Sequence, residues 1–218
     1  MTLSVADRVA AFEAKAAAEF PAEALQVFVE ERALQGAKAP IGLPAVGTAM
    51  PGGDLLDAHG KPTTLAAARA GRPVVVVFYR GAWCPYCNVA LRAYQEDLLP
   101  ELTARGIGLV AISPQKPDGA LSIQETNELQ YAVLSDPGNQ IAGALGILTE
   151  TGAAAAAVQA QLGLVVADTN ADGTPAIPMP TTVILDADGV IRWIDVHPDY
   201  GTRTEPTEIL KQVADLIG

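Results

Sequence analysis

The stretch that decides the fold is residues 73–87, which read PVVVVFYRGAWCPYC. Its first part, from Pro73 to Tyr79, is a continuous hydrophobic run rich in β-branched residues, which favours a central strand covered on both faces. The run leads into Cys84 and Cys87, the only two cysteines of the chain. Because a helical pattern follows the pair, the spacing C-x-x-C after a buried strand indicates a redox site at a strand-to-helix corner.

The segments around this stretch predict alternating strands and helices. Residues 88–105 have helical periodicity and end at Gly106, as expected for a helix C-terminus. Residues 107–113 are the next strand, so the order strand, helix, strand implies a parallel crossover. Further elements are a hairpin over 54–65, helices over 122–128, 140–145 and 205–217, and strands over 131–135, 181–186 and 190–196. The predicted fold is an α/β sandwich with a mixed central sheet.

The chain divides into an arm and a main domain. Residues 1–39 form a predicted N-terminal helical extension, because apolar residues recur at helical spacing over 2–35 and Gly36 then breaks the pattern. This arm packs on the core or on a partner subunit, or else lies on the surface as a flap. The main domain is residues 40–218. Within it, residues 150–175 run from an alanine-rich helix to a turn-rich segment and indicate an insertion.

Composition limits the function. The chain has 218 residues, of which half are hydrophobic, so it can bury a sizeable core. Its net charge of −11 argues against nucleic acid and anionic membranes as partners. Neither a secretory signal nor an apolar run of spanning length is visible. We therefore expect a cytoplasmic protein, and in a reducing compartment a lone cysteine pair is more often catalytic or metal-binding than structural.

The position of the pair at a helix start predicts a reactive thiol. Cys84 would meet unpaired backbone N–H groups and the positive end of the helix dipole, which favour a thiolate. This chemistry favours Cys84 as the more exposed, attacking sulfur, with Cys87 one turn away and within reach of a disulfide. A zinc site would need more ligands, for which the chain offers only His59 and His197. We expect neither a metal nor a cofactor.

Several other residues are candidates for supporting the pair. Trp83 precedes the first cysteine, and Arg80 and Arg92 bracket the motif, where they could stabilise a thiolate or serve only as surface arginines. Tyr200 and Arg203 belong to a polar cluster after the last predicted strand, and we suspect that they line the site. A capped loop before the final helix would explain this cluster nearly as well.

A proline leads into a late strand in the segment Met179-Pro180-Thr181. This segment resembles the cis-proline loop that faces the cysteines in thioredoxin-like folds, and a cis bond is an option particular to proline. A trans proline at a strand entrance is the plainer interpretation.

From about Pro44 to the C-terminus, the chain resembles the alkyl hydroperoxide reductase and thiol-specific antioxidant family, the peroxiredoxins. The resemblance rests, in chain order, on residues 54–65, 74–87, 109–113, 134–137 and 182–192. It implies a thioredoxin-fold core, peroxide reduction by a cysteine, and a homodimer.

The immediate surroundings of the cysteines depart from the family pattern. Where the family has a proline and a threonine, this chain has Arg80 and Cys84, and the peroxidatic position falls on Cys87. The family's distant arginine aligns with Pro180, and Arg80 could stand in for it. The resemblance thus implies that Cys87 attacks peroxide and Cys84 resolves.

The motif Trp83-Cys84-x-x-Cys87 is also shared with thioredoxins, and that similarity implies that Cys84 attacks a disulfide. We therefore keep three hypotheses. The first is an antioxidant thiol peroxidase with a redox-active cysteine pair that reduces hydrogen peroxide or organic hydroperoxides and is recycled by thioredoxin or a similar dithiol. The second is a thiol–disulfide oxidoreductase acting on protein disulfides. The third is a redox-sensing protein that uses the N-terminal arm as its partner surface.

Overall fold

The computed structural model describes residues 4–217. Its helices are α1 (Val5–Glu19), α2 (Ala22–Gly36), α3 (Leu65–Arg69), α4 (Pro85–Ala93), the π-helical η1 (Tyr94–Leu98), α5 (Leu99–Ala104), α6 (Pro117–Thr126), α7 (Gln140–Ala144), α8 (Ala153–Gln161), α9 (Val166–Thr169) and α10 (Pro206–Ile217). Its strands are β1 (Leu55–Leu56), β2 (Pro62–Thr63), β3 (Val74–Phe78), β4 (Gly108–Ser113), β5 (Ala132–Ser135), β6 (Leu148–Thr149), β7 (Ile177–Pro178), β8 (Thr181–Leu185) and β9 (Ile191–Val196).

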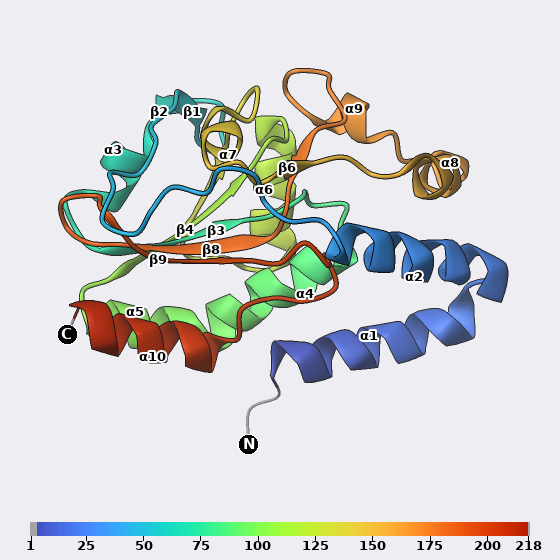
Figure 1. The fold of residues 1–218 in the computed structure, drawn as a ribbon, viewed down its shortest axis with the longest axis horizontal. Helices are drawn as coiled ribbons and strands as arrows, with labels where there is room; N and C mark the ends of the chain where they lie inside the picture. Colours follow the sequence, from blue (N-terminus) through green and yellow to red (C-terminus); the bar gives the residue numbers. More distant parts are fainter. Residues whose placement is uncertain (1–3, 218) are drawn as a thin grey trace.

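Seven strands form one mixed sheet in the order β2-β1-β5-β4-β3-β8-β9. Strand β3 runs parallel to β4, and β4 runs parallel to β5, as the strand–helix–strand pattern predicts. The other neighbour of β3 is the antiparallel β8, whose residue Thr181 pairs with Phe78. Figure 1 shows this sheet with helices on both faces. The predicted α/β sandwich with a mixed sheet is confirmed.

Alternating side chains of β3 enter two separate cores. Val75 and Val77 face one core, together with side chains from α4, α5, α6 and α10. Val74 and Val76 face the other core, with side chains from α3 and α7. All five residues of β3 are buried, which explains why its sequence is a continuous apolar run rather than an alternating one.

The long helix after the cysteines contains a π turn. The predicted helix over 88–105 begins earlier, at Pro85, and widens between Tyr94 and Leu98 before it continues as α5. There the backbone N–H of Leu99 bonds to the carbonyl of Tyr94, five residues back. Pro100 has no N–H to donate and its ring crowds the preceding turn, which accounts for the wider turn. Likewise, α6 begins at Pro117 rather than at residue 122, because proline suits the first helical turn.

The N-terminal arm consists of α1 and α2, and residues 2 and 3 of its predicted helix lie outside the described residues. Figure 1 shows α1 beside α4 at the end of the sheet that carries the cysteines, with α2 beside α8. Helices α8 and α9 lie within the predicted insertion. The short pair of β6 and β7 flanks this segment, and two-residue strands leave little periodicity to detect. The division into an extension, a main domain and an insertion stays a prediction.

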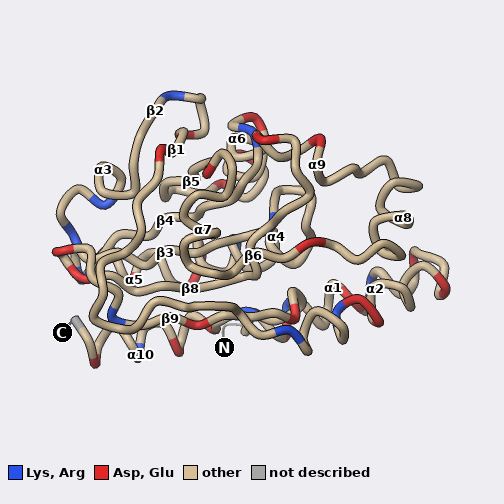
Figure 2. Tube along the Cα trace, turned by 45° about the horizontal axis from the view of Figure 1, so that its top comes forward, with Lys and Arg blue, Asp and Glu red and all other residues tan. Residues whose placement is uncertain are grey.

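The negative charge is spread over the outside of the molecule, with acidic residues on α1, α2 and α10 among others (Figure 2). None of the helices between residues 4 and 217 is both long enough and apolar enough to cross a membrane.

The packing of β4 generates a stability prediction. Ile112 is fully buried, and truncating it to alanine leaves a cavity in the core between the sheet and helices α3 and α7. We expect Ile112→Ala to lower the free energy of unfolding by about 2–5 kcal/mol in urea titrations. Val46→Ala, at an exposed valine, is the control and should change it by less than about 0.5 kcal/mol. Equal effects of the two substitutions would contradict the assigned core.

Candidate active site

The loop between β3 and α4 is fixed by side chains from other elements. A Cβ atom at Gly81 would lie 2.9 Å from the side-chain amide carbon of Gln115, so only glycine fits this close approach. The amide oxygen of Gln115 accepts the backbone N–H of Ala82. Asn88 donates to the carbonyl of Ala82 at 2.7 Å and to that of Cys84 at 3.0 Å. These contacts hold the loop over the first turn of α4.

The two cysteines occupy the start of α4. Cys84 is the N-cap residue, and its carbonyl accepts the backbone N–H of Cys87 at 3.0 Å. Both are free thiols, and their exposed fractions are 1% and 0%. Exposure therefore does not distinguish the two sulfurs as the sequence suggests, because packed side chains cover the N-cap position as well.

Arg203 donates from Nη2 to the Sγ atom of Cys87 at 3.0 Å. This arginine is buried, and its other terminal nitrogen donates to the carbonyls of Tyr200 and Thr202, each at 2.6 Å. A buried guanidinium needs such partners, since an unpaired charge is costly away from water. The arrangement presents a fixed positive charge to one sulfur of the pair.

The surroundings of the two sulfurs separate their pKa values. Burial by itself raises the pKa of Cys87, but a hydrogen bond from Cys84, the charge of Arg203, and a backbone hydrogen bond and charge from Arg80 outweigh it and bring the pKa well below its usual range. Burial, the hydrogen bond to Cys87 and the charge of Cys87 all raise the pKa of Cys84. These surroundings favour the thiolate form at Cys87 over the thiolate form at Cys84.

Arg80 is buried beside the cysteines. Its guanidinium carbon lies 3.9 Å from the ring centroid of Tyr200 and 5.0 Å from that of Trp83. One terminal nitrogen donates to the hydroxyl of Thr151 at 3.3 Å, at the start of the predicted insertion. Among the described residues, the Nε atom of Arg80 and the indole nitrogen of Trp83 are buried and have no hydrogen-bond partner. The hydrogen-bonding capacity of these two donors is therefore unused by the described residues.

The loop that carries Arg203 is anchored to the core on both sides. The hydroxyl of Tyr94, in the π turn, donates to the carbonyl of Thr204 at 2.7 Å. The hydroxyl of Thr204 donates to Asp195 at 2.8 Å, and His197 contacts the same carboxylate at 2.9 Å. The π turn thus helps to position the arginine that contacts the thiolate.

Two predicted site residues differ from expectation. The Met179–Pro180 bond is trans, since no cis peptide bond occurs between residues 4 and 217. Pro180 lies next to Thr181, at the end of the sheet where the cysteines lie. Arg92 is exposed on α4, where it pairs with Glu96 at 3.0 Å, because its helical position turns it to solvent. Pro180 therefore does not have the predicted cis form, and Arg92 is not brought to the cysteines.

Sequence reasoning missed four residues that surround the site, namely Arg32, Asn88, Gln115 and Thr151. Only Asn88 carried a local signal, since it directly follows Cys87. The other three come from distant segments, and only the folded chain brings them to the motif.

The histidines that a zinc site would need serve other contacts. His197 bonds to Asp195 and Thr202, and His59 lies in the exposed turn between β1 and β2. Over residues 4–217, no three His, Cys, Asp or Glu side chains are grouped so that they could hold a metal ion.

Relatives of this chain share its core. A Mycobacterium tuberculosis protein, whose name assigns it provisionally to the peroxiredoxins, is 34% identical over 104 residues, which are 48% of this chain and 65% of that protein. The matched part of this chain thus spans less than two thirds of that relative. The chloroplastic peroxiredoxin Q of Populus jackii is 26% identical over 171 residues, or 78% of this chain and 67% of that protein.

Solved structures agree in fold. The crystal structure of the peroxidoxin BcpB from Mycobacterium tuberculosis superposes with a TM-score of 0.59 at 20% identity, covering 78% of this chain and 97% of that one. The model of the AhpC/TSA family matches residues 46–194, more than half of the chain. This match covers the central strand, both cysteines and the strands that support them, and the protein therefore belongs to the AhpC/TSA family.

Proposed function

We propose that the protein is a thiol peroxidase in which Cys87 attacks the peroxide. The observation that carries the proposal is the 3.0 Å contact between Arg203 Nη2 and Cys87 Sγ, inside a family whose relatives are named as peroxiredoxins. A thiolate is the nucleophilic form of cysteine, and the geometry favours it at Cys87. The substrate would be hydrogen peroxide or an organic hydroperoxide.

The first step oxidises Cys87. Its thiolate attacks the hydroxyl oxygen of the hydroperoxide, so that an S–O bond forms and the O–O bond breaks. The electron pair of the broken bond leaves on the other oxygen, which takes a proton from solvent and departs as water or an alcohol. Cys87 is left as a sulfenic acid. Negative charge moves from sulfur to the leaving oxygen, so fixed donors near both atoms lower the barrier.

Two buried arginines supply those donors. Arg203 contacts the attacking sulfur, and the unpartnered Nε of Arg80 is free to donate to a peroxide oxygen. The cation–π contact with Tyr200 and the hydrogen bond to Thr151 hold Arg80 in place. Arg80 and Arg203 would thus supply the charge that the family's distant arginine supplies elsewhere, since Pro180 occupies its aligned position.

The second step makes Cys84 the resolving residue. Its sulfur attacks the sulfur of the sulfenic acid, an S–S bond forms, the S–O bond breaks, and the hydroxyl leaves with the thiol proton as water. The first step favours this one, because it removes the charge on Cys87 that raises the pKa of Cys84. Arg80 and Arg203, which lower that pKa, remain in place.

Recycling needs an external dithiol such as thioredoxin, which would reduce the disulfide by exchange and be oxidised in turn. A reducing, cytoplasmic compartment would keep the pair in its dithiol form. The homodimer stays a prediction.

A protein-disulfide oxidoreductase is the alternative, and the N-cap position of Cys84 before a C-x-x-C spacing is the observation that favours it. That activity would use Cys84 as the first nucleophile, whereas burial and the neighbouring thiolate raise the pKa of Cys84. Reduction of insulin disulfides that needs Cys84 and no peroxide would support the alternative over the peroxidase.

Cysteine variants test the assignment of the two sulfurs. When the reduced Cys87→Ser variant is mixed with hydrogen peroxide, its rate of peroxide consumption should fall to that of a free thiol. Cys84→Ser should still react once and accumulate a sulfenic acid on Cys87, seen as a 16 Da mass increase or by dimedone trapping. Oxygen addition to Cys84 in the Cys87→Ser variant, at the rate of the unmodified protein, would reverse the assignment. No acceleration over a free thiol in the unmodified protein would refute the peroxidase itself.

The charge of Arg203 generates a pH prediction. Iodoacetamide alkylation of Cys87 should rise with pH as the thiolate forms and reach half its maximum well below the ordinary thiol value of about 8.5. Arg203→Gln removes a charge that lowers the pKa, so the midpoint should move up. Arg203→Lys keeps the charge and should move it less. Arg92→Gln is the control and should leave it unchanged. A midpoint at or above about 8.5 in the unmodified protein would contradict the proposed thiolate.

The donor assigned to the leaving oxygen generates a prediction on catalysis. Arg80→Gln should lower the second-order rate constant with hydrogen peroxide by about 100-fold, the scale expected when one fixed donor to a developing charge is lost. The measurement is stopped-flow peroxide consumption at a pH where both proteins are fully thiolate. An unchanged rate constant under those conditions would contradict the role of Arg80 at the leaving oxygen.

A further inference from the structure

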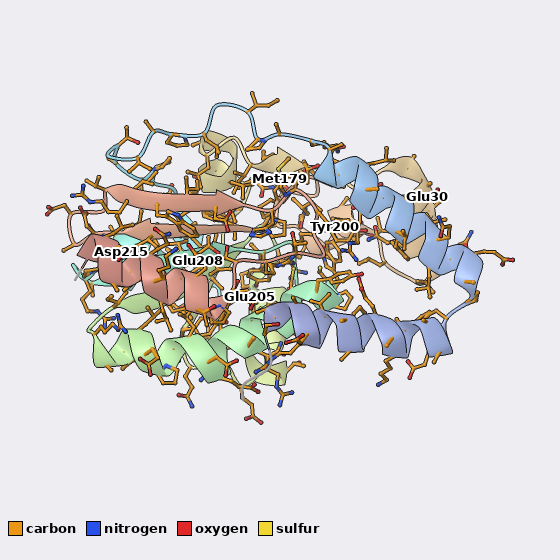
Figure 3. The ribbon with its side chains drawn as sticks, turned by 60° about the horizontal axis from the view of Figure 1, so that its bottom comes forward. Glu30, Met179, Tyr200, Glu205, Glu208 and Asp215 are labelled. Carbon is orange, nitrogen blue, oxygen red and sulfur yellow. The ribbon has the colours of Figure 1, made fainter. Side chains whose placement is uncertain are left out.

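Of the two residues between the cysteines, Pro85 is exposed and Tyr86 is half-buried against the N-terminal arm. The ring of Tyr86 packs edge-on against Phe12 of α1, with centroids 5.4 Å apart, and the guanidinium carbon of Arg32 in α2 lies 5.2 Å from its centroid. Its hydroxyl donates to Glu13 at 3.2 Å. On the core side, the ring of Tyr200 is 5.9 Å away. Figure 3 shows Tyr200 beneath α2 and between the two helices of the arm.

The arm therefore covers the Tyr86 side of the first turn of α4, and leaves Pro85 exposed. Cys84 and Cys87 are essentially unexposed, and Tyr86 is held by both arm helices. Exchange with a protein dithiol requires a sulfur of the partner to come into bonding contact with one of these sulfurs. With both sulfurs buried, this contact requires a local opening beside Tyr86, the residue that both arm helices hold.

The part of the arm over the motif is fastened by polar contacts. Arg32 bonds to both carboxylate oxygens of Asp199, at 2.8 and 3.1 Å, and also to Glu13. In α2, Gln35 donates to the carbonyl of Glu150 at 2.8 Å.

Helix α2 buries polar residues and exposes apolar ones, which is the reverse of an ordinary surface helix. It buries Glu31, which accepts the backbone N–H of Gly152 at 2.9 Å, and it buries Gln35. Meanwhile Val29 and Leu34 are 56% and 67% exposed. A helix with polar residues on its buried side is held by hydrogen bonds and charge more than by apolar contact.

The start of α1 is attached differently. Val5 and Val9 are buried in the same core as the cysteines, and the backbone N–H groups of Val5 and Ala6 donate to Glu205 at 2.8 and 2.9 Å. Figure 3 shows Glu205 at this end of α1. The apolar anchor thus lies at the beginning of the arm, and the polar attachment lies over the cysteines.

We propose that α2 and the C-terminal half of α1 form a lid that opens over the cysteine pair to admit the protein reductant. This inference rests on the proposed function. The contacts of Arg32 with Asp199 and Glu13 are electrostatic and only part-buried, so salt screens them and this part of the arm can separate while the core stays folded. The family match begins at residue 46, so the arm lies wholly outside the matched core. The start of α1 stays attached to the core, and the lid would pivot about it.

The test measures access to Cys87 in the full chain without using its activity. The reduced protein is alkylated with iodoacetamide on the upper plateau of its pH profile, where the thiolate fraction no longer changes, and modification of Cys87 is followed by mass spectrometry. Arg32→Gln removes the contact to Asp199. Arg192→Gln is the matched control, because Arg192 forms a similar ion pair, 2.7 Å from Asp186, in the β8–β9 hairpin. Asp199→Asn weakens the contact with Arg32 from the other partner, and the new side chain has almost the same shape as the old one.

Arg32→Gln should speed alkylation by about three- to tenfold, 0.5 M NaCl should do the same in the unmodified protein, and Arg192→Gln should not. Arg32→Gln should also speed recycling by thioredoxin more than recycling by dithiothreitol, which is small. Unchanged alkylation in Arg32→Gln, in Asp199→Asn and in salt would overturn the lid while leaving the peroxidase intact. Faster alkylation in a protein that consumes no peroxide would refute the proposed function and keep the lid.

Discussion

A sulfur anion in a protein interior needs a fixed positive charge beside it, and in this protein Arg203 provides it for Cys87. Burial alone would keep the thiol protonated. The guanidinium offsets that cost only because its own position is determined by the carbonyls of Tyr200 and Thr202. The loop is in turn tied to Tyr94 through the carbonyl of Thr204. The reactivity of the site thus depends on a loop more than a hundred residues after the motif.

This contact also divides the roles of two chemically identical side chains. The helix start alone favours a thiolate at Cys84, which is the N-cap residue. In the fold, however, Cys84 is as buried as Cys87, and Arg203 reaches the second sulfur rather than the first. The nearer positive charge outweighs the helix end, since an ion-to-ion contact in a buried setting is stronger than the partial charge of a helix terminus.

The additions to the family core gather around the same turn of α4. Thr151, at the start of the predicted insertion, holds Arg80, and Arg32 of the arm holds Tyr86. Helix α2 and the insertion are joined by contacts such as that of Glu31 with Gly152. The core carries the two cysteines, and the arm and the predicted insertion pack around them.

Much of the fold is determined by the sequence itself. The buried strand, the helix after the cysteines and the order of the strands follow from local apolar patterns, because each pattern has the period of the element that it forms. The sequence also predicts the cysteine pair and the candidate site residues Arg80, Tyr200 and Arg203. Only the tertiary structure decided that Arg203 contacts Cys87 rather than Cys84, that Arg92 turns to solvent, and that Arg32 packs on Tyr86. These depend on distances between segments far apart in the chain, and local pattern carries no information about those distances.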